Sequence, residues 1–237
     1  MNASIQFPLV FTALEQEAAA IRRPLTKPPR EIEVHVIGPR GALLGGQLGR
    51  QFGGRLRGRI EPAAIQIPPP GHPIVVAGIA GGLNPALRTG DVVVTGVPDP
   101  CVKAISASLG LRVHPGTVTT APEIISTPGH KAQIRSDTGA DAVEMELDAV
   151  RAWAPAARII SVRAIGDTAH DTLPPFLIDL VDGDGRPRTL RAVRTALVKP
   201  SRIPALIRAG NQAATACRSL GQVIAGIVEA IAKEKYG

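Results

Sequence analysis

Residues 74–79 read Ile-Val-Val-Ala-Gly-Ile, and residues 92–95 read Val-Val-Val-Thr. Both apolar runs are short, rich in β-branched residues and bounded by glycine, which is typical of buried strands. Similar runs recur along the chain, and the further strands they predict are residues 8–11, 32–37, 112–120, 142–145 and 158–165. Because helical patterns separate these runs, the sequence predicts an α/β protein with a largely parallel or mixed sheet and helices on both faces.

Two helices can be placed from local signals. Thr12 is followed by Glu15 at the spacing of a capping box, so a helix is expected to start there and to run to Arg22, before Pro24. A last helix is expected after Arg208. Its apolar packing positions are Leu220, Val223, Ile224, Ile227 and Val228.

The composition excludes several classes of protein. The chain has 237 residues, of which 44% are hydrophobic and 20% charged, a normal globular mixture. Two cysteines cannot build a disulfide framework or a four-cysteine metal site, and the five dispersed histidines show no metal-ligand spacing. Glycine-rich dinucleotide, Walker A and GxSxG motifs are absent. We therefore expect no metal and no cofactor.

Residues 186–208 form a basic segment with seven Lys and Arg residues and no acidic one. Leu190, Val193, Leu197 and Val198 interleave with these charges at helical spacing, which predicts a basic amphipathic helix. The net charge of +7 permits nucleic acid, anionic lipid or phosphate as partners. Nucleic acid is disfavoured, because base stacking needs aromatic side chains and the segment has none.

Several carboxylates lie where a ligand site is expected. Glu17 lies in the first turns of the helix after the first strand, Glu144 and Glu146 end an apolar run, and Asp167 follows the run 159–165. Ligands of α/β sheets collect at the carboxyl ends of strands, so these residues are candidates. Each could instead be a helix cap or a solvated first-turn acid. Gly81 and Gly82 permit a close backbone approach to a ligand, or form only a tight turn.

Four segments together resemble the superfamily of purine nucleoside phosphorylases and methylthioadenosine/adenosylhomocysteine nucleosidases. They are Thr-Ala-Leu-Glu-Gln-Glu-Ala at 12–18, residues 76–94 around Ala-Gly-Gly-Leu-Asn-Pro, Ala-Val-Glu-Met-Glu at 142–146, and Val-Arg-Ala-Ile-Gly-Asp-Thr-Ala at 162–169. The resemblance implies a three-layer α/β fold with a central, mixed, twisted sheet flanked by helices, as one domain over residues 1–237. Residues 171–188 and the basic tail resemble the hopanoid-biosynthesis branch, whose members are thought to remove adenine from adenosylhopane.

The resemblance also implies roles for individual residues. Asp167 would be the acid that protonates purine N7, and Glu17 would orient the attacking water. Glu146 would hold the ribose hydroxyls. Met145 would pack against the ribose, or belong to the core. The remaining residues expected at the substrate are Ile79, Gly81 and Gly82.

The chain departs from the family pattern at several of these positions. Ile79 stands where many relatives have a hydroxyl residue that contacts ribose or phosphate, and Gly166 replaces the usual serine before Asp167. Ile124 and Ile125 fall where nucleosidases place a base-stacking Phe. The loss of the hydroxyl at position 79 and the role that the resemblance implies for Glu17 together favour hydrolysis over phosphorolysis.

The sequence therefore predicts an enzyme that cleaves the N-glycosidic bond of a purine nucleoside. The resemblance to the hopanoid-biosynthesis branch implies that this nucleoside is linked to a lipid. A phosphate-dependent phosphorylase remains the alternative, and a non-catalytic basic module that binds membrane or nucleic acid remains the second. No secretory signal is visible and the apolar runs are too short to span a bilayer, so the expected location is the cytoplasm, with peripheral contact at the inner membrane surface. The resemblance implies a homo-oligomer, in the simplest case a dimer.

Overall fold

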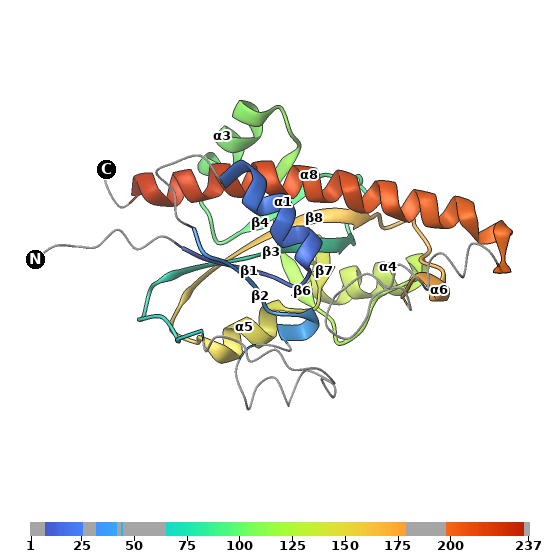
Figure 1. The fold of residues 1–237 in the computed structure, drawn as a ribbon, viewed down its shortest axis with the longest axis horizontal. Helices are drawn as coiled ribbons and strands as arrows, with labels where there is room; N and C mark the ends of the chain where they lie inside the picture. The colour runs from blue at the N-terminus through green and yellow to red at the C-terminus, as the bar shows by residue number, and fades with distance from the viewer. Residues whose placement is uncertain (1–7, 26–31, 42–43, 45–64, 179–197, 235–237) are drawn as a thin grey trace, which may run out of the picture.

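The computed structural model describes residues 8–25, 32–41, 44, 65–178 and 198–234 (Figure 1). The strands are β1 (Leu9–Thr12), β2 (Val34–Val36), β3 (Pro73–Gly82), β4 (Val92–Thr95), β5 (Val113–Pro115), β6 (Val118–Thr120), β7 (Ala142–Glu144) and β8 (Arg158–Asp167). The helices are α1 (Glu15–Leu25), α3 (Asp99–Leu109), α4 (Pro128–Thr138), α5 (Leu147–Trp153), α6 (Pro175–Ile178) and α8 (Ile203–Glu234), with 3-10 turns η1 (Pro39–Gly41) and η2 (Pro200–Arg202).

Strands β3 and β8 are the centre of a sheet with the order β2-β1-β3-β8-β4-β5. Neighbours in this order are parallel, except that β4 runs antiparallel to β8. Strand β7 pairs antiparallel with the end of β3 and parallel with β6. The register between β3 and β8 shifts after Ala80, so Gly81 lies opposite Asp167. The expected mixed sheet is confirmed, and this irregularity lies where the site was expected.

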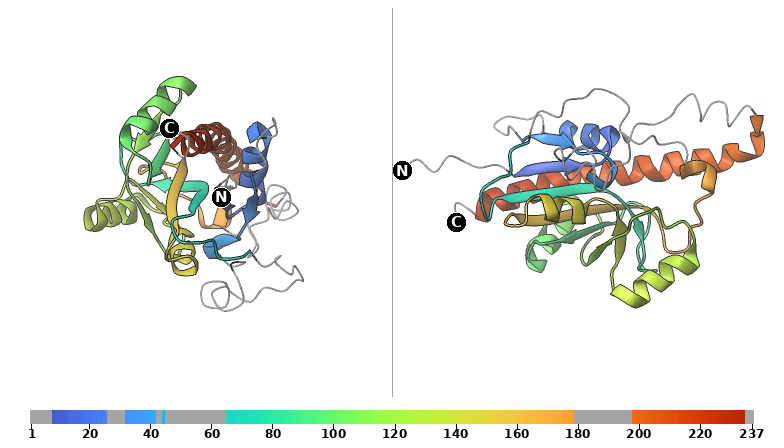
Figure 2. Two further views of the ribbon diagram at one scale, coloured as in Figure 1. Left: turned by 90° about the vertical axis from the view of Figure 1, so that its left-hand side faces the viewer. Right: turned by 90° about the horizontal axis from the view of Figure 1, so that it is seen from below.

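Helices cover both faces of the sheet, as expected for three layers. Helices α1, α3 and α8 lie on one face, and α5 lies on the other with η1 (Figures 1 and 2). Alternate residues of β3 enter the two cores: Val75 and Ala77 pack under α8, while Ile74 and Val76 pack toward α5. Since successive side chains of a strand point to opposite faces, one continuous apolar run supplies both cores.

The start of the first helix differs from the expectation. Helix α1 begins at Glu15, and the Glu17 side chain reaches back to accept from the backbone N–H groups of Ala13 and Leu14, the two residues before the helix. The Thr12 hydroxyl instead donates to the Leu14 carbonyl at 3.4 Å. Pro24 lies inside the last turn, so the helix extends to Leu25 rather than ending before the proline.

Residues 112–120 do not form a single strand, so that expectation is wrong. They divide into β5 and β6 on either side of Gly116, and the two strands pair with different neighbours, β4 and β7. Pro115 has no N–H to continue the ladder. A Cβ at Gly116 would lie 2.7 Å from Oδ2 of Asp141, so the chain crosses close to that side chain.

Helix α8 has 32 residues and starts at Ile203, whereas the helix was expected only after Arg208. Its five predicted packing residues, Leu220, Val223, Ile224, Ile227 and Val228, are all buried. By length and composition alone, α8 could cross a membrane, a feature that the sequence analysis missed because polar residues interrupt its apolar runs. Half of the apolar stretch is buried inside the fold, as in the core helix of a globular protein.

The predicted basic helix lies largely outside the described residues, including Leu190, Val193 and Leu197. Its described part, residues 198–208, contains η2 and the first turns of α8. Val198, Ile203 and Ile207 are 66%, 38% and 58% exposed there, so the start of α8 presents apolar side chains to solvent.

Candidate functional site

A cavity of about 320 Å³ opens at the carboxyl ends of β1, β3, β7 and β8. Six of the seven residues predicted for the site line it: Glu17, Ile79, Gly81, Met145, Glu146 and Asp167. The seventh, Gly82, does not line the cavity, because it is buried where β3 meets β7 and β8. A Cβ at Gly82 would meet Ile165 and the backbone of Asp167 at 3.2 and 3.3 Å.

Glu17 is a buried carboxylate that links α1 to β3. Its Oε2 accepts hydrogen bonds from the backbone N–H groups of Ala13 and Leu14, at 3.1 and 2.9 Å. Its Oε1 accepts from Ile79 N at 2.8 Å. Burial raises the pKa of Glu17, although these donors and Arg163 oppose the shift. Only 2% of Glu17 is exposed, so the alternative that it is a solvated acid in the first turn is wrong. The alternative that it caps the helix start applies to Oε2 alone.

Glu144 holds the β7–α5 junction together and has little capacity left for a ligand. Its carboxylate accepts from the Thr120 hydroxyl at 2.7 Å and from the backbone N–H groups of Glu146 and Leu147 at 2.9 and 3.0 Å. It is also ion-paired with Arg163. The N-terminus of α5 is thus capped by Glu144, which settles the cap alternative for this residue.

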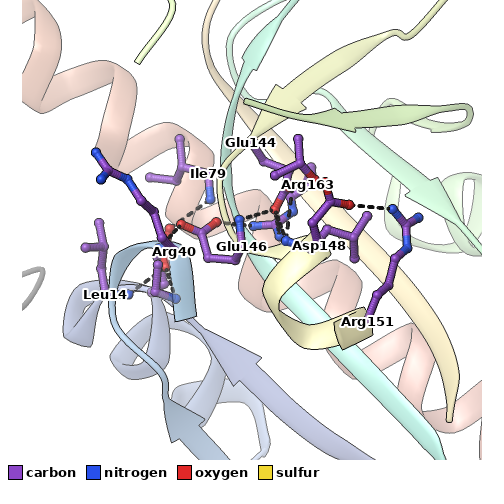
Figure 3. A network of polar contacts seen from close by, with 12 residues as sticks. Leu14, Arg40, Ile79, Glu144, Glu146, Asp148, Arg151 and Arg163 are labelled. Carbon is purple, nitrogen blue, oxygen red and sulfur yellow. Dashed lines mark hydrogen bonds and ion pairs between the residues drawn. The ribbon is translucent and has the colours of Figure 1, made fainter. Parts of the chain in front are cut away.

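Glu146 is buried but loosely held (Figure 3). Arg163 Nη1 lies 3.4 Å from its Oε2, and Arg40 N donates to its Oε1 at 3.4 Å from a left-handed backbone conformation, with φ 57°. Burial raises the pKa of Glu146 to about 7 against the charge of Arg163, and the carboxylates of Glu144 and Glu17 act in the same direction as burial. A group with these long contacts can exchange them for a ligand's hydroxyl groups.

Arg163 is the charge on which these carboxylates converge, and the sequence analysis did not single it out. Its side chain is 1% exposed, on β8, and its Nη1 lies so close to β3 that a Cβ at Gly78 would be 2.6 Å away. The sequence signal that could have identified Arg163 is its position as a single arginine inside the apolar run 159–165. A buried guanidinium requires buried partners, and the nearby carboxylates were the candidates.

Asp167 ends β8 and is 15% exposed at the cavity wall. Its Oδ2 accepts from Lys131 Nζ, an ammonium that is completely buried on α4. Burial raises the pKa of Asp167, while the charge of Lys131 acts in the opposite direction. Lys131 was also missed. Helix α4 is largely polar, so no periodicity distinguished its one buried side chain from its solvated ones.

Apart from Gln16 and Glu123, the remaining described lining of the cavity is apolar. Ile124, 42% exposed, and Ile125, 6% exposed, line the wall at the positions where the resemblance implied a missing aromatic ring. Met145 lies half-buried between the two glutamates. None of the described residues that line the cavity is aromatic, so a planar ligand would pack against branched aliphatic side chains.

Comparison of the sequence with protein-family models and with curated protein sequences gave no match. Solved structures do match. Futalosine hydrolase of Helicobacter pylori aligns with a TM-score of 0.59 and 12% identity over 95% of this chain and 98% of its own. The 5′-methylthioadenosine/S-adenosylhomocysteine nucleosidase of Neisseria meningitidis, in complex with methylthio-immucillin-A, aligns with a TM-score of 0.59 and 17% identity over 95% and 99%.

The fold is that of these nucleosidases. A further nucleosidase, from Campylobacter jejuni, agrees with a TM-score of 0.55 and 15% identity over 96% and 99% of the two chains. The fold implied by the sequence resemblance is therefore confirmed. At these identities the likeness establishes the fold, and the chemistry has to be argued from the cavity itself.

Proposed function

We propose that this protein is an enzyme that hydrolyses the N-glycosidic bond of a purine nucleoside. One observation carries the proposal: Glu17, Glu146 and Asp167, which come from three separate segments, line one cavity, and burial raises the pKa of all three. Perturbed carboxyl groups that gather in a cleft are typical of acid–base catalysis.

In this proposal Asp167 is the general acid. Cleavage breaks the bond between C1′ and N9, whose electron pair moves to the purine, and a proton from Asp167 to N7 makes the base a neutral leaving group. A positioned acid of this kind contributes ~10²–10⁴-fold. Burial favours the protonated form of Asp167, which is the form that can donate.

The two glutamates complete the reaction from the sugar side. Glu146 accepts the ribose hydroxyls in place of its long contacts to Arg40 and Arg163, and its charge stabilises positive charge that develops on the sugar. Glu17 orients a water molecule and takes its proton as the oxygen bonds to C1′. The three backbone donors fix the Glu17 carboxylate in place beforehand.

Hydrolysis is favoured over phosphorolysis by the charges at the cavity. The described residues that line it include five carboxylates and no basic side chain: Glu17, Glu123, Glu144, Glu146 and Asp167. A phosphate dianion would enter this field with no basic side chain to pair with among the described lining residues. Ile79, which stands where a hydroxyl could have contacted phosphate, also presents an apolar wall.

The finer substrate assignment is an adenine nucleoside carried on a hydrophobic group at a membrane surface. The exposed apolar and basic residues at the start of α8 support it, because they lie beside the loop that follows Asp167. Arg202 stacks over the Phe176 ring at 4.5 Å, and Gln212 contacts Asp171 at 3.4 Å. For the assembly state, the proposal is a homo-oligomer.

The test is incubation of the protein with adenosine-type nucleosides, with and without phosphate, followed by quantification of free base and free sugar. Release of adenine at equal rates in both conditions is the expected result. Release only with phosphate would assign a phosphorylase. If no base is released from any nucleoside, the remaining hypothesis is the non-catalytic binding module. A poor rate on 2′-deoxyadenosine relative to adenosine is expected from the proposed role of Glu146.

A further inference from the structure

Lys131 is a buried charge that the proposed reaction does not yet use. Its ammonium has three N–H donors, and three oxygens surround it: Oδ2 of Asp167, the Thr168 carbonyl at 2.6 Å and the Asp171 carbonyl at 3.3 Å. Every donor is thus satisfied by one turn of chain at the end of β8. Since a buried ammonium is costly unless it is fully paired, Lys131 and this turn depend on each other.

The turn is held from its other side as well. The Asp171 carboxylate accepts from the backbone N–H and the hydroxyl of Thr168, both at 2.8 Å, and from Gln212 of α8. Burial acts to raise the pKa of Asp171, but the Thr168 donors and the charge of Lys131 outweigh it, and the net pKa is lowered. Residues 167–171 are therefore fixed between α4 and α8.

Building on the proposed function, we infer that Lys131 is a positioning residue for the general acid: it holds Oδ2 of Asp167 from behind, so that Oδ1 is the oxygen presented to the purine, and it determines the pH range over which Asp167 carries the proton. Lys131 is not among the residues that line the cavity. It acts only through Asp167 and the turn. This distinguishes it from the residues that would touch the substrate.

The charge of Lys131 lowers the pKa of Asp167. It stabilises ionised Asp167, so the acid with Lys131 is stronger and loses its proton at a lower pH than the acid without it. Asp171 in the turn acts in the opposite direction to Lys131. The other titratable groups nearby are His170 in the same turn and the glutamates at the cavity, Glu17, Glu123, Glu144 and Glu146. Among the described residues, Lys131 is the cation that is ion-paired with Asp167.

The experiment compares the pH dependence of kcat and kcat/KM for the unaltered protein, Lys131→Met and Lys131→Gln. Methionine has the length of the lysine stem without its charge, and glutamine keeps a donor without the charge. For both variants we expect the alkaline limb, where activity falls as Asp167 loses its proton, to move up by about one pH unit or more. We expect kcat to fall ~10-fold or more, with KM changed less than kcat.

Arg135→Met is the matched control. Arg135 lies on the same helix and is paired with Asp141 at 3.2 Å, away from Asp167, so its loss tests the stability of α4 alone. Its pH profile should superimpose on that of the unaltered protein. If Lys131→Ala is folded, small alkylammonium ions that fit the vacated space should restore activity in an order set by their length.

The outcomes separate this inference from the proposed function. Nucleoside cleavage with unshifted limbs in both Lys131 variants would overturn the role of Lys131 and leave the function standing. If the unaltered protein cleaves no nucleoside, the function fails, and titration of the ¹³C-labelled Asp167 carboxyl by NMR decides the inference instead. Equal Asp167 pKa values with and without Lys131 would then reject it. Should Lys131→Met not fold, Lys131→Gln carries the same comparison.

Discussion

A Cβ atom at Gly166 would lie 2.6 Å from Cγ2 of Ile79 on the neighbouring strand. No side chain is accommodated at that distance, and the methyl group of a β-branched residue has little freedom to withdraw. The two positions at which this chain lacks an expected hydroxyl group are therefore one packing feature. With isoleucine at position 79, a side chain at position 166 would force its surroundings to shift, and glycine avoids that cost.

This contact predicts strong coupling between substitutions at the two positions. Gly166→Ala should destabilise the protein by about 1–3 kcal/mol through overpacking, since no left-handed backbone is involved at this glycine. In an Ile79→Ala background most of that loss should disappear. Chemical denaturation of the two single variants and the double variant gives the coupling energy. Additive losses would mean that the two residues do not exclude each other's side chains.

The acid role of Asp167 predicts that Asp167→Asn lowers kcat by at least ~10²-fold with the fold retained, because the amide has no acidic proton to give to N7. Asp137→Asn, an exposed change on α4, serves as the control and should be silent. Steady-state kinetics with circular dichroism are sufficient. A folded Asp167→Asn variant with nearly normal turnover would remove this residue from the acid role.

Glu17 is predicted to act on water and not on nucleoside binding. Glu17→Gln should lower kcat by ~10²-fold or more, while the dissociation constant of a non-cleavable nucleoside analogue changes less than about 3-fold. Glu15→Gln changes an exposed residue in the same turn and controls for effects on α1. Calorimetry supplies the affinity. Loss of analogue binding without loss of kcat would reverse the assignment.

The raised pKa of Glu146 predicts that the stability of the protein depends on pH. Its pKa is raised from 4.5 to about 7 by burial, so between these values the folded protein holds a proton that the unfolded chain releases. The stabilisation from this group is complete below pH 4.5 and is lost as pH rises toward 7, by at most about 3 kcal/mol. The free energy of unfolding relative to Glu146→Gln should fall over that window. A constant difference would show that Glu146 titrates normally.

The start of α8 predicts binding to anionic membranes. Lys199 and Arg208 are exposed beside the apolar side chains of Val198, Ile203 and Ile207. Each charge near an anionic surface contributes ~1 kcal/mol, which salt screens. Co-sedimentation with anionic vesicles should therefore occur at low salt and weaken at high salt. Lys199→Glu with Arg208→Glu should abolish it, whereas reversal of the exposed Lys103 and Arg88 should not. Absence of sedimentation at low salt would count against a lipid-linked substrate.

Local sequence signals were sufficient to predict where the chain is extended and which acids lie at strand ends. Residues 92–95 were predicted as a strand and are β4 without change, because a β-branched run between glycines defines its own backbone. Asp167 and Glu146 were found in the same way, as carboxylates at the ends of apolar runs. These are local properties, which periodicity and residue type report directly.

The surroundings of those acids, in contrast, depend on contacts between segments that are distant in the sequence. Glu17 is buried because the backbone of Ile79, 62 positions away, donates to it, and Asp167 is paired because Lys131 reaches it from a helix with no apolar pattern. Residue exposure and charge pairing depend on which distant segments pack together. A carboxylate in a solvated turn and one under a sheet edge have the same local sequence signal, so burial, pKa and partner were visible only in the assembled fold.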